Sequence, residues 1–387
     1  MSRTAATPAP VRVLYVRHGF RLGGAERSIL NLARHGPEHG LVSGLAVIGR
    51  SSVDWRQTQL AEVAELGVPV TVFPRTARSL RHPQHLLEAT SGVRRLARRL
   101  RADIVDTSGA SASLVGRLAC VGTRTFHVTE MESSRGDARA PSSTPWRLAR
   151  WFYRRSYSLT AGFVAVSATL LDEDLLGGVL PADRITVIPR GVDLEEFPAQ
   201  PLPAPSLDDG LRLLSVGRLV PSKDHLTAIR AVGLLRARGG NASLTIAGAG
   251  PLRADLDREI GALGLGGCVK LKGPWRDVAG LHREHDAFVF PTRFEALPLA
   301  ALEAMASARP VVVSDIPSLR AIAGDTGIYF PPGDAEALAM SLDRLLRTPI
   351  ARRRRIGLEA RARVESAFDA RRQVGALVDY YRSLTSR

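Results

Sequence analysis

Two glutamates eight positions apart, Glu295 and Glu303, are the residues whose type and spacing best suit chemistry on a ligand. The apolar run 288–291 before them predicts a buried strand that ends in a turn. Pro298 stands where a helix would begin, because proline is favoured at the first helical position. Glu295 would therefore lie in the loop before this helix, and Glu303 about one and a half turns inside it.

The start of this predicted helix suits an anion, and the two carboxylates suit hydroxyl groups. Free backbone N–H groups at a helix start can hold a phosphate, and the residues at this start are Ala296, Leu297, Pro298 and Leu299. A carboxylate in an otherwise apolar helix needs hydroxyl or N–H partners, which sugar hydroxyls would supply. The alternative is that Glu295 only caps the helix and Glu303 faces solvent, and spacing alone does not separate the two interpretations.

A second group of charges lies in 217–224, the loop expected after the first strand in the second half of the chain. It contains Arg218 and Lys223. Two fixed cations in such a loop could hold an anionic group, with arginine forking onto two oxygens and lysine acting as a point charge. Only three of the 53 basic residues are lysines, which favours a chemical need for Lys223. The alternative is an ordinary solvated loop.

The composition is that of a globular protein with a large positive charge. A length of 387 residues suggests two or three domains, and an apolar content of 45% is enough for two sizeable cores. The net charge of +15 would suit nucleic acid, an anionic membrane surface or anionic small substrates. No nucleic-acid motif occurs, so no nucleic-acid partner is expected.

No part of the sequence predicts secretion or a membrane span. The two cysteines, Cys120 and Cys268, cannot form a disulfide framework. Residues 1–10 lack the apolar core of a signal peptide. No apolar run reaches the roughly 18 residues of a membrane helix. We therefore expect a cytoplasmic protein.

Strand-like apolar runs alternate with helical patterns in both halves of the chain, which predicts parallel βαβ units. In the first half the strands are expected at 11–16, 45–48, 68–73, 104–107 and 163–166, and the helices at 25–35 and 83–101. In the second half the strands are expected at 211–216, 244–247, 269–271, 287–290, 311–313 and 328–330. The proline-dense stretch 197–205 predicts a linker. An α/β fold of two halves would bind its ligand in the cleft between them.

Together these motifs resemble the family-four glycosyltransferases (glycosyl transferases group 1), which are retaining nucleotide-sugar enzymes of the GT-B fold. Glu295 and Glu303 resemble the Glu-x7-Glu signature, and the loop 217–224 resembles the Gly-Arg-x4-Lys motif. Other motifs follow in the family's order along nearly the whole chain. The resemblance implies two Rossmann-like parallel-sheet domains that face each other across a cleft. The chain would then consist of an acceptor-side domain at 1–197, a linker at 198–210 and a nucleotide-sugar-binding domain at 211–370. A closing helix at 371–387 would pack back toward the first domain.

The resemblance implies a role for each matching residue. Arg218 and Lys223 would hold the donor diphosphate. Glu303 would accept hydrogen bonds from the ribose hydroxyls, and Glu295 would orient the transferred sugar and support its developing positive charge. His127 resembles a histidine that lies near the transferred sugar, where it would orient a hydroxyl group.

Three further loops carry less specific matches. The resemblance assigns Gly250 to the wall of the nucleotide site, and a tight turn is the alternative. Arg276 falls in the loop beside the base, where its neighbour Trp275 would equally suit core packing, the interpretation we favour. Gly24 opens the first helix, where the family's loop approaches the donor phosphates or the acceptor, and a sharp strand-to-helix connection is the alternative.

Some features depart from the family pattern or are rejected as sites. Arg190 stands where asparagine is common, and Arg320 lies near a position where many relatives carry glutamate. The runs 172–174 and 255–257 mimic the Asp-x-Asp of metal-dependent sugar transferases, but neither directly follows an expected strand. Since the two cations of the loop 217–224 would neutralise the leaving group, no metal and no other cofactor is expected.

The leading hypothesis is a retaining glycosyltransferase that moves a sugar from a UDP-, GDP- or ADP-linked donor to a glycan, lipid-linked or small-molecule acceptor. Cell-surface polysaccharide or glycolipid synthesis is the expected setting. The aromatic and basic segment 147–155 would suit peripheral contact with an anionic membrane, and a plain helix is its alternative. Two other functions stay open: a nucleotide-sugar epimerase or phosphorylase of the same fold, and a non-catalytic protein that binds membrane or polyanion.

Overall fold

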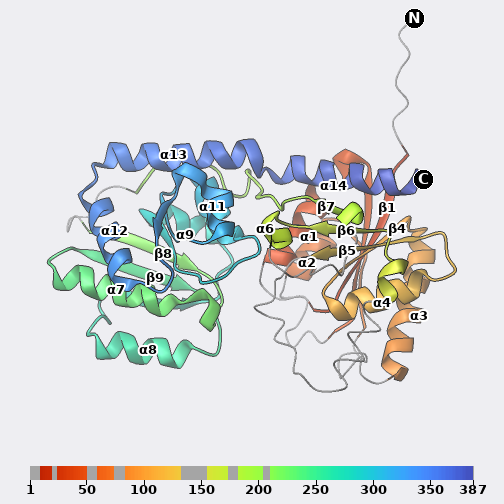
Figure 1. Cartoon of the computed structure of the whole chain (residues 1–387), viewed down its shortest axis with the longest axis horizontal. Coiled ribbons are helices and arrows are strands. Elements are labelled where there is room, and N and C mark those ends of the chain that lie inside the picture. Colours follow the sequence, from red (N-terminus) through yellow and green to blue (C-terminus); the bar gives the residue numbers. More distant parts are fainter. Residues whose placement is uncertain are drawn as a thin grey trace, which may run out of the picture. The chain divides into compact units, whose positions relative to one another are not determined.

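The computed structural model describes residues 9–19, 24–49, 59–73, 83–131, 155–172, 182–203 and 210–386. Contacts divide the chain into two compact units (Figure 1): unit 1 consists of Met1–Arg190 with Ala370–Arg387, and unit 2 of Gly191–Asp369. Each unit is a parallel β-sheet with helices on both faces.

Unit 1 is built on a seven-stranded parallel sheet with the strand order β3-β2-β1-β4-β5-β6-β7. Its strands are β1 (Val11–Arg17), β2 (Leu41–Val47), β3 (Val70–Val72), β4 (Ile104–Ser108), β5 (Phe126–Met131), β6 (Gly162–Ala165) and β7 (Ile185–Val187). Side chains alternate along a strand, so Val13 and Tyr15 enter one core whereas Leu14 and Val16 enter the other.

Helices cover both faces of this sheet. The core that contains Tyr15 is closed by α1 (Gly24–His35), α2 (Gln59–Glu65) and α14 (Ala370–Thr385). The core that contains Leu14 is closed by α3 (Pro83–Leu100) and α4 (Ala110–Cys120). The remaining short elements are η1 (Pro37–His39), η5 (Ser156–Leu159), α6 (Thr169–Asp172) and η6 (Ala182–Arg184). The C-terminal helix thus completes the core of unit 1 although it follows unit 2 in the chain.

Unit 2 has a six-stranded parallel sheet with the order β10-β9-β8-β11-β12-β13, the doubly wound order. Its strands are β8 (Leu211–Val216), β9 (Ala242–Ala247), β10 (Val269–Gly273), β11 (Ala287–Phe290), β12 (Val311–Ser314) and β13 (Ile328–Phe330). Alternation again divides the side chains: Ala287 and Val289 enter one core, and Phe288 and Phe290 the other.

The helices of unit 2 form a layer on each face of the sheet (Figure 1). One layer consists of α7 (His225–Ala237), α8 (Arg253–Ala262) and α12 (Ala335–Arg347). The other consists of α9 (Val278–Glu284), α10 (Leu299–Ala306), α11 (Pro317–Ala323) and α13 (Ile350–Ala367). Two 3₁₀ turns, η7 (Pro221–Lys223) and η8 (Gly324–Thr326), lie in the connections.

The prediction of two parallel α/β halves is confirmed, and the differences concern single elements. Two strands, β5 and β7, were not predicted. In β5 the residues His127, Thr129 and Glu130 are polar but buried, so the strand lacks a continuous apolar run. In β7 only three residues pair, too few for a clear pattern.

The proline-dense stretch differs from a free linker over its described part. Phe197 is 1% exposed in a core of unit 2. Arg309 Nη2 donates hydrogen bonds to the carbonyl oxygens of Gln200 and Pro201 at 3.0 and 2.8 Å. The division between the units therefore falls after Arg190, before the prolines rather than among them.

Candidate active site

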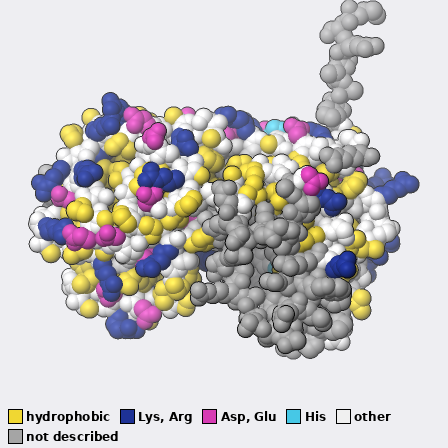
Figure 2. Space-filling view, viewed as in Figure 1, with side chains coloured by type: hydrophobic (Ala, Val, Ile, Leu, Met, Phe, Trp, Pro, Cys, Tyr) yellow, Lys and Arg dark blue, Asp and Glu magenta, His cyan; other side chains and the backbone are white. Residues whose placement is uncertain are grey.

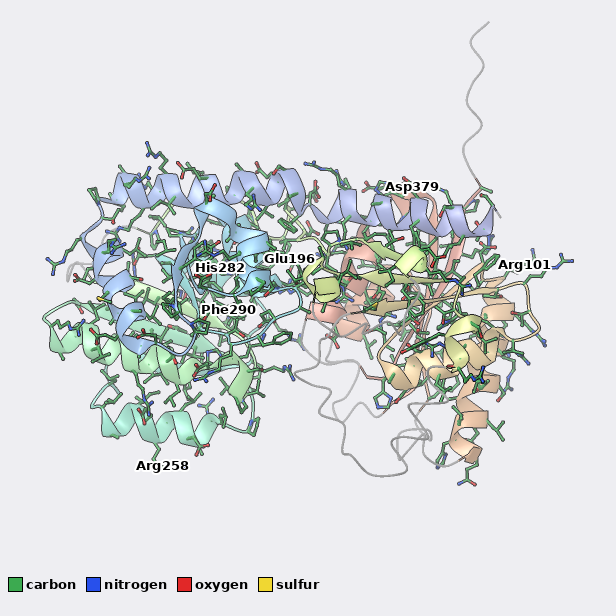
Figure 3. The ribbon with its side chains drawn as sticks, in the orientation of Figure 1. Arg101, Glu196, Arg258, His282, Phe290 and Asp379 are labelled. Carbon is green, nitrogen blue, oxygen red and sulfur yellow. The ribbon has the colours of Figure 1, made fainter. Side chains whose placement is uncertain are left out.

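The candidate site lies at the centre of the unit 2 sheet, where β8 and β11 run side by side. The chain continues from β8 to β9 on one side and from β11 to β12 on the other, so the strand order reverses between them. Ligands of open α/β sheets bind outside the carboxyl ends of strands at such a point. The loop after β8 carries Arg218 and Lys223, and the loop after β11 carries Glu295. Phe290, labelled in Figure 3, marks the end of β11.

Lys223 and Glu295 form a direct ion pair although 72 positions separate them in the chain. Lys223 Nζ donates to Glu295 Oε1, and Thr292 Oγ1 donates to the same oxygen at 3.1 Å. Nζ also lies 5.1 Å from the centre of the Phe290 ring. The two charged side chains are only 16% and 12% exposed, so little water competes with the pair. Lys223, which was predicted to bind phosphate, and Glu295, which was predicted to bind the sugar, therefore neutralise each other in this structure.

The turn that presents Lys223 is held by the loop after β11. Asp224 has a φ of 47°, the left-handed region that residues other than glycine rarely adopt. Its Oδ2 accepts hydrogen bonds from Arg293 Nε at 2.8 Å and from Thr227 Oγ1 at 2.9 Å. The Arg293 N–H donates to the carbonyl oxygen of Ser222 at 2.8 Å. These bonds fix the turn from both sides and hold Lys223 over the end of β11.

Arg218 lies in a loop that is packed tightly against the loop after β9. A Cβ atom at Gly248 would lie 1.8 Å from the Gly217 carbonyl oxygen, and one at Gly250 would lie 2.3 Å from the Leu219 carbonyl oxygen. Close backbone approach therefore accounts for Gly250, which also begins the turn considered above, since the Arg253 N–H donates to its carbonyl oxygen at 3.3 Å. Arg218 itself is exposed, and no ion pair is formed by it within the described part of the chain.

The start of α10 differs from the prediction. Pro298 is the N-cap rather than the first helical residue, and a proline has no N–H. The Leu299 N–H donates to the Leu297 carbonyl oxygen at 3.0 Å. Of the four residues expected to offer free amides, two therefore do not. Among the described residues, the N–H groups of Ala296, Leu297 and Ala300 donate no backbone hydrogen bond at this helix start.

Glu303 is buried at the fifth of the eight positions of α10, with 5% exposure. Its neighbours Leu302 and Ala304 are fully buried, as the apolar sequence of this helix requires. The interpretation in which Glu303 faces solvent is therefore wrong. Whether its carboxylate meets a ribose remains a prediction.

His225 is a residue of this site that the sequence interpretation missed. It is the first residue of α7, lies beneath the loop after β8, and is 2% exposed. Its Nδ1 lies 3.2 Å from Ser215 Oγ, and burial lowers the pKa of the imidazole to about 4, so the ring is neutral at ordinary pH. The sequence could have indicated His225, because it lies two positions after Lys223 at the start of a helix.

Three weaker candidates have different outcomes. Trp275 is 43% exposed, and Lys272 Nζ lies 3.9 Å from the centre of its ring, so the favoured prediction of core packing is wrong. Arg276 is exposed beside it. Gly24 is the first residue of α1, and the preceding Gly23 lies outside the described residues. Ligand contact by Arg276 or Gly24 remains a prediction.

His127 is locked inside unit 1. It is 1% exposed, with Nε2 at 3.0 Å from Thr107 Oγ1 and Nδ1 at 3.0 Å from Thr160 Oγ1. Burial, assisted by the charge of Arg117, lowers the pKa of the imidazole to about 3. This geometry contradicts the prediction that His127 orients a sugar hydroxyl, because both ring nitrogens are already used within the domain.

A buried charge network closes the carboxyl end of the unit 1 sheet. Arg17 donates to Asp106 at 3.0 Å and to Glu130 at 2.9 Å, and Arg190 donates to Glu130 at 3.0 Å. The Tyr381 hydroxyl of α14 donates to Asp106 at 2.9 Å. Burial, and then the charge of Glu130, raises the pKa of the Asp106 carboxyl, against the opposing effects of Arg17 and Tyr381. Arg190, noted above as a departure, is thus a structural cation of unit 1.

Other charged features form surface ion pairs. On α8, Asp255 pairs with Arg258 at 2.7 Å, and Asp257 pairs with Arg253 at 3.6 Å. Arg320 forks onto one carboxylate, that of Asp315, at 2.6 and 2.7 Å. Within the described ranges, no three His, Cys, Asp or Glu residues gather closely enough to hold a metal ion. No helix of those ranges combines the length and apolarity that crossing a bilayer requires. The run 172–174 extends beyond the described residues.

Two family models match the chain. The model described as Glycosyltransferase Family 4 matches residues 22–196, and the model described as Glycosyl transferases group 1 matches residues 210–348. The second range contains both loops of the candidate site.

Curated relatives and solved structures agree with these models. The chain is 30% identical to the alpha-D-kanosaminyltransferase of Streptomyces kanamyceticus over 267 residues, 64% of this chain and 68% of the relative. It is 24% identical to the putative glycosyltransferase EpsF of Bacillus subtilis over 97% of both chains. Among solved structures, Anabaena Alr3699/HepE in complex with UDP and glucose superposes with a TM-score of 0.79 at 17% identity, covering 96% of this chain and all of that chain. A glycosyltransferase from Rickettsia africae gives 0.77 at 18% identity, covering 97% and 98%.

Proposed function

We propose, from the premise that the chain belongs to the group 1, family 4 glycosyltransferases, that it is a retaining enzyme whose donor is a nucleoside-diphosphate sugar. Glycosyl transfer and the GT-B fold follow from that membership. The observation that carries the rest is the convergence of Lys223, Glu295 and the start of α10 at the strand-order reversal of unit 2.

The donor diphosphate lies between the loop after β8 and the start of α10. Arg218 is exposed and lacks an acidic partner within the described ranges, so its guanidinium forks onto phosphate oxygens. The amides of Ala296 and Leu297 donate to the same group, aided by the positive end of the helix dipole. Lys223 leaves Glu295 to meet the charge that develops as the diphosphate departs. These groups do the work of a divalent ion, so the reaction needs no metal.

The two glutamates hold the sugars on either side of the diphosphate. Once Lys223 turns to phosphate, Glu295 is free to orient the transferred sugar and to stabilise its positive charge, with Thr292 fixing the carboxylate. Glu303, buried within α10, accepts hydrogen bonds from the ribose hydroxyls. Departure and attack take place on one face of the sugar, which retains the anomeric configuration.

The acceptor is a glycan or a lipid-linked sugar, bound mainly by unit 1, and the reaction takes place in the cytoplasm. The names of several relatives support this class of acceptor. They include the amylovoran biosynthesis glycosyltransferase AmsK of Erwinia amylovora, 35% identical over half of each chain, and the putative colanic acid biosynthesis glycosyltransferase WcaL of Escherichia coli. A cell-surface polysaccharide or glycolipid is therefore the proposed product.

A thermal-shift screen of UDP-, GDP- and ADP-sugars tests the donor, because a ligand that binds the folded state raises its melting temperature. The stabilising donor is then incubated with acceptors, and the anomeric configuration of the product is read by NMR. We expect one nucleotide to stabilise the protein, and its sugar to be transferred with retention. Inversion, epimerised free donor, or no stabilisation by any nucleotide sugar would contradict the proposal.

A further inference from the structure

The helix α3 and the turn after α4 form a surface rich in arginines. We call it the α3 surface, and it consists of Arg94, Arg95, Arg98, Arg99, Arg101 and Arg124. None of these six forms an ion pair with a described residue. The two acids nearest in sequence lie beside other groups: Glu88 Oε2 is 3.8 Å from His85 Nδ1, and Asp103 accepts the backbone N–H of Arg12 at 2.8 Å.

The contrast with helices α8 and α12 of unit 2 shows that an arginine-rich helix of this chain can carry its own acidic partners. On α8, Arg253 and Arg258 each have an aspartate within one helical turn, and on α12 Arg347 pairs with Asp343 at 2.9 Å. Figure 2 shows acidic groups beside many of the basic ones over unit 2. Pairs at these spacings neutralise a helix face. The α3 surface instead keeps its positive charge, which attracts an anionic partner.

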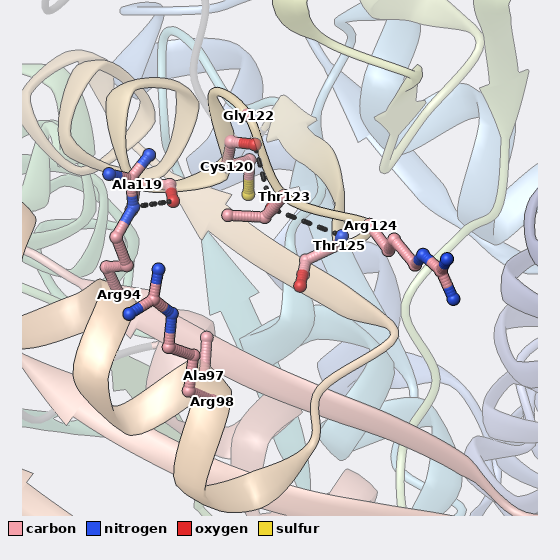
Figure 4. Close-up of a pocket in the computed structure, with 9 residues that line it drawn as sticks. All are labelled: Arg94, Ala97, Arg98, Ala119, Cys120, Gly122, Thr123, Arg124 and Thr125. Carbon is pink, nitrogen blue, oxygen red and sulfur yellow. Dashed lines mark hydrogen bonds between the residues drawn. The ribbon is translucent and has the colours of Figure 1, made fainter.

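A cavity of about 250 Å³ opens within the α3 surface, between α3 and the turn after α4 (Figure 4). Arg94 donates from Nε to the Ala119 carbonyl oxygen at 3.0 Å and from Nη2 to that of Val121, so it also satisfies the end of α4. Arg98 lies beside it on α3, whereas Arg124 at the rim points away. Burial raises the pKa of the Cys120 thiol to about 12, so no thiolate opposes an anion there.

Apolar side chains accompany these charges. Leu87 on α3 is 69% exposed, and Val121 in the turn is 46% exposed. Leu87 precedes Arg94 by seven positions and Arg98 by eleven, so the three lie on one side of the helix. Arg101, at the end of α3, projects away from the unit (Figure 3). Guanidinium groups beside exposed aliphatic side chains match the boundary between lipid headgroups and acyl chains, whereas a soluble polyanion would use only the charges.

We propose that the α3 surface docks unit 1 on an anionic lipid bilayer, with a lipid phosphate entering the cavity beside Arg94 and Arg98. Leu87 and Val121 then enter the acyl boundary while the outer arginines meet neighbouring headgroups. The segment 147–155, considered above for the same role, lies almost wholly outside the described residues and plays no part in the argument. Docking on lipid is independent of the donor chemistry proposed for unit 2.

Vesicle sedimentation of the full chain tests the proposal without an activity readout. We expect binding to vesicles of equal parts phosphatidylglycerol and phosphatidylcholine, and none to phosphatidylcholine alone. The variant Arg95→Gln/Arg98→Gln should bind roughly tenfold to thirtyfold more weakly, because each basic residue near an anionic leaflet is worth about fivefold. The matched control is Arg352→Gln/Arg354→Gln, which removes two exposed arginines without described partners from α13 and should leave binding unchanged.

A second comparison separates lipid from other polyanions. Leu87→Ser should weaken vesicle binding while leaving binding to dextran sulfate unchanged, with circular dichroism showing that both variants are folded. Equal losses in the two arginine variants would mean that net charge alone is responsible, and would overturn the proposal. It would also be overturned if Leu87→Ser left vesicle binding unchanged, since the surface would then be a polyanion site.

Discussion

Because Lys223 and Glu295 form an ion pair, we predict that removing the Glu295 charge strengthens nucleotide binding but slows sugar transfer. The variant Glu295→Gln removes the charge that holds Lys223 Nζ in this structure. Lys223 is then available to a nucleoside diphosphate without first leaving a carboxylate. We therefore expect Glu295→Gln to bind the product nucleotide more tightly than the wild type, although it transfers sugar far more slowly.

The expected gain in nucleotide affinity depends on how deeply the Lys223–Glu295 pair is buried. The two side chains are 16% and 12% exposed, so their hydrogen bond is mostly shielded from water. Hydrogen bonds to charged groups contribute about 1.5–3 kcal/mol, and a glutamine at this position still accepts a bond from Lys223. The lower end of the range applies, and the affinity should rise by about tenfold.

Isothermal titration calorimetry with the nucleoside diphosphate that best stabilises the wild type measures this gain. Lys223→Gln should bind it more weakly, and the double variant should match Lys223→Gln, because Glu295 acts on the nucleotide through Lys223. The matched control is Glu259→Gln on α8, which removes the same charge from a surface pair with Arg230 of α7. An affinity for Glu295→Gln that is unchanged or lower, or an equal gain in the control, would refute the reasoning.

Three further predictions concern stability. Gly250→Ala should destabilise unit 2 by about 1–3 kcal/mol, because its Cβ would lie 2.3 Å from a backbone oxygen; thermal denaturation beside Gly261→Ala, where the space is open, checks this. His127 should cost about 2 kcal/mol of stability at pH 5, since its pKa falls from 6.5 to about 3 on folding and the unfolded chain binds the proton first as pH drops; His127→Asn should remove that slope in denaturant titrations. Tyr381→Phe should lower the stability of unit 1 by about 1–3 kcal/mol, because Asp106 loses a buried donor; an unchanged melting temperature would contradict it.

The sequence predicted the sheet of unit 2 more closely than that of unit 1, and the reason is apolar continuity. The strands β8, β11 and β13 have the predicted bounds, because each is an apolar run that ends at a glycine, a proline or a turn. In unit 1, β5 was missed because its buried residues are polar, as His127 shows by its contacts with Thr107 of β4 and with Thr160. A pattern of hydrophobicity cannot report a core that is held by hydrogen bonds.

The residues of the candidate site could be named from the sequence, but their contacts could not. The pairing of Lys223 with Glu295 depends on β8 lying next to β11, which is a property of the sheet order rather than of either motif. The error at Pro298 was chemical, since a proline cannot donate an amide wherever the helix begins. The prediction that Trp275 packs in a core was wrong because an aromatic ring can stay at the surface when a lysine covers it.

Both sheets carry charged residues where the strand order reverses, but these residues are buried and paired in unit 1 and partly accessible in unit 2. In each sheet the strand order reverses beside the first strand, between β1 and β4 in unit 1 and between β8 and β11 in unit 2. In unit 1 the charges there are 6% exposed or less, and every carboxylate has a cation or hydroxyl partner. At the same point in unit 2 the arginine is exposed and the lysine pairs with a single glutamate. Three N–H groups there donate no backbone hydrogen bond among the described residues. Residue types alone would allow a diphosphate in either unit, and the accessibility of these groups is the reason we propose unit 2 as its site.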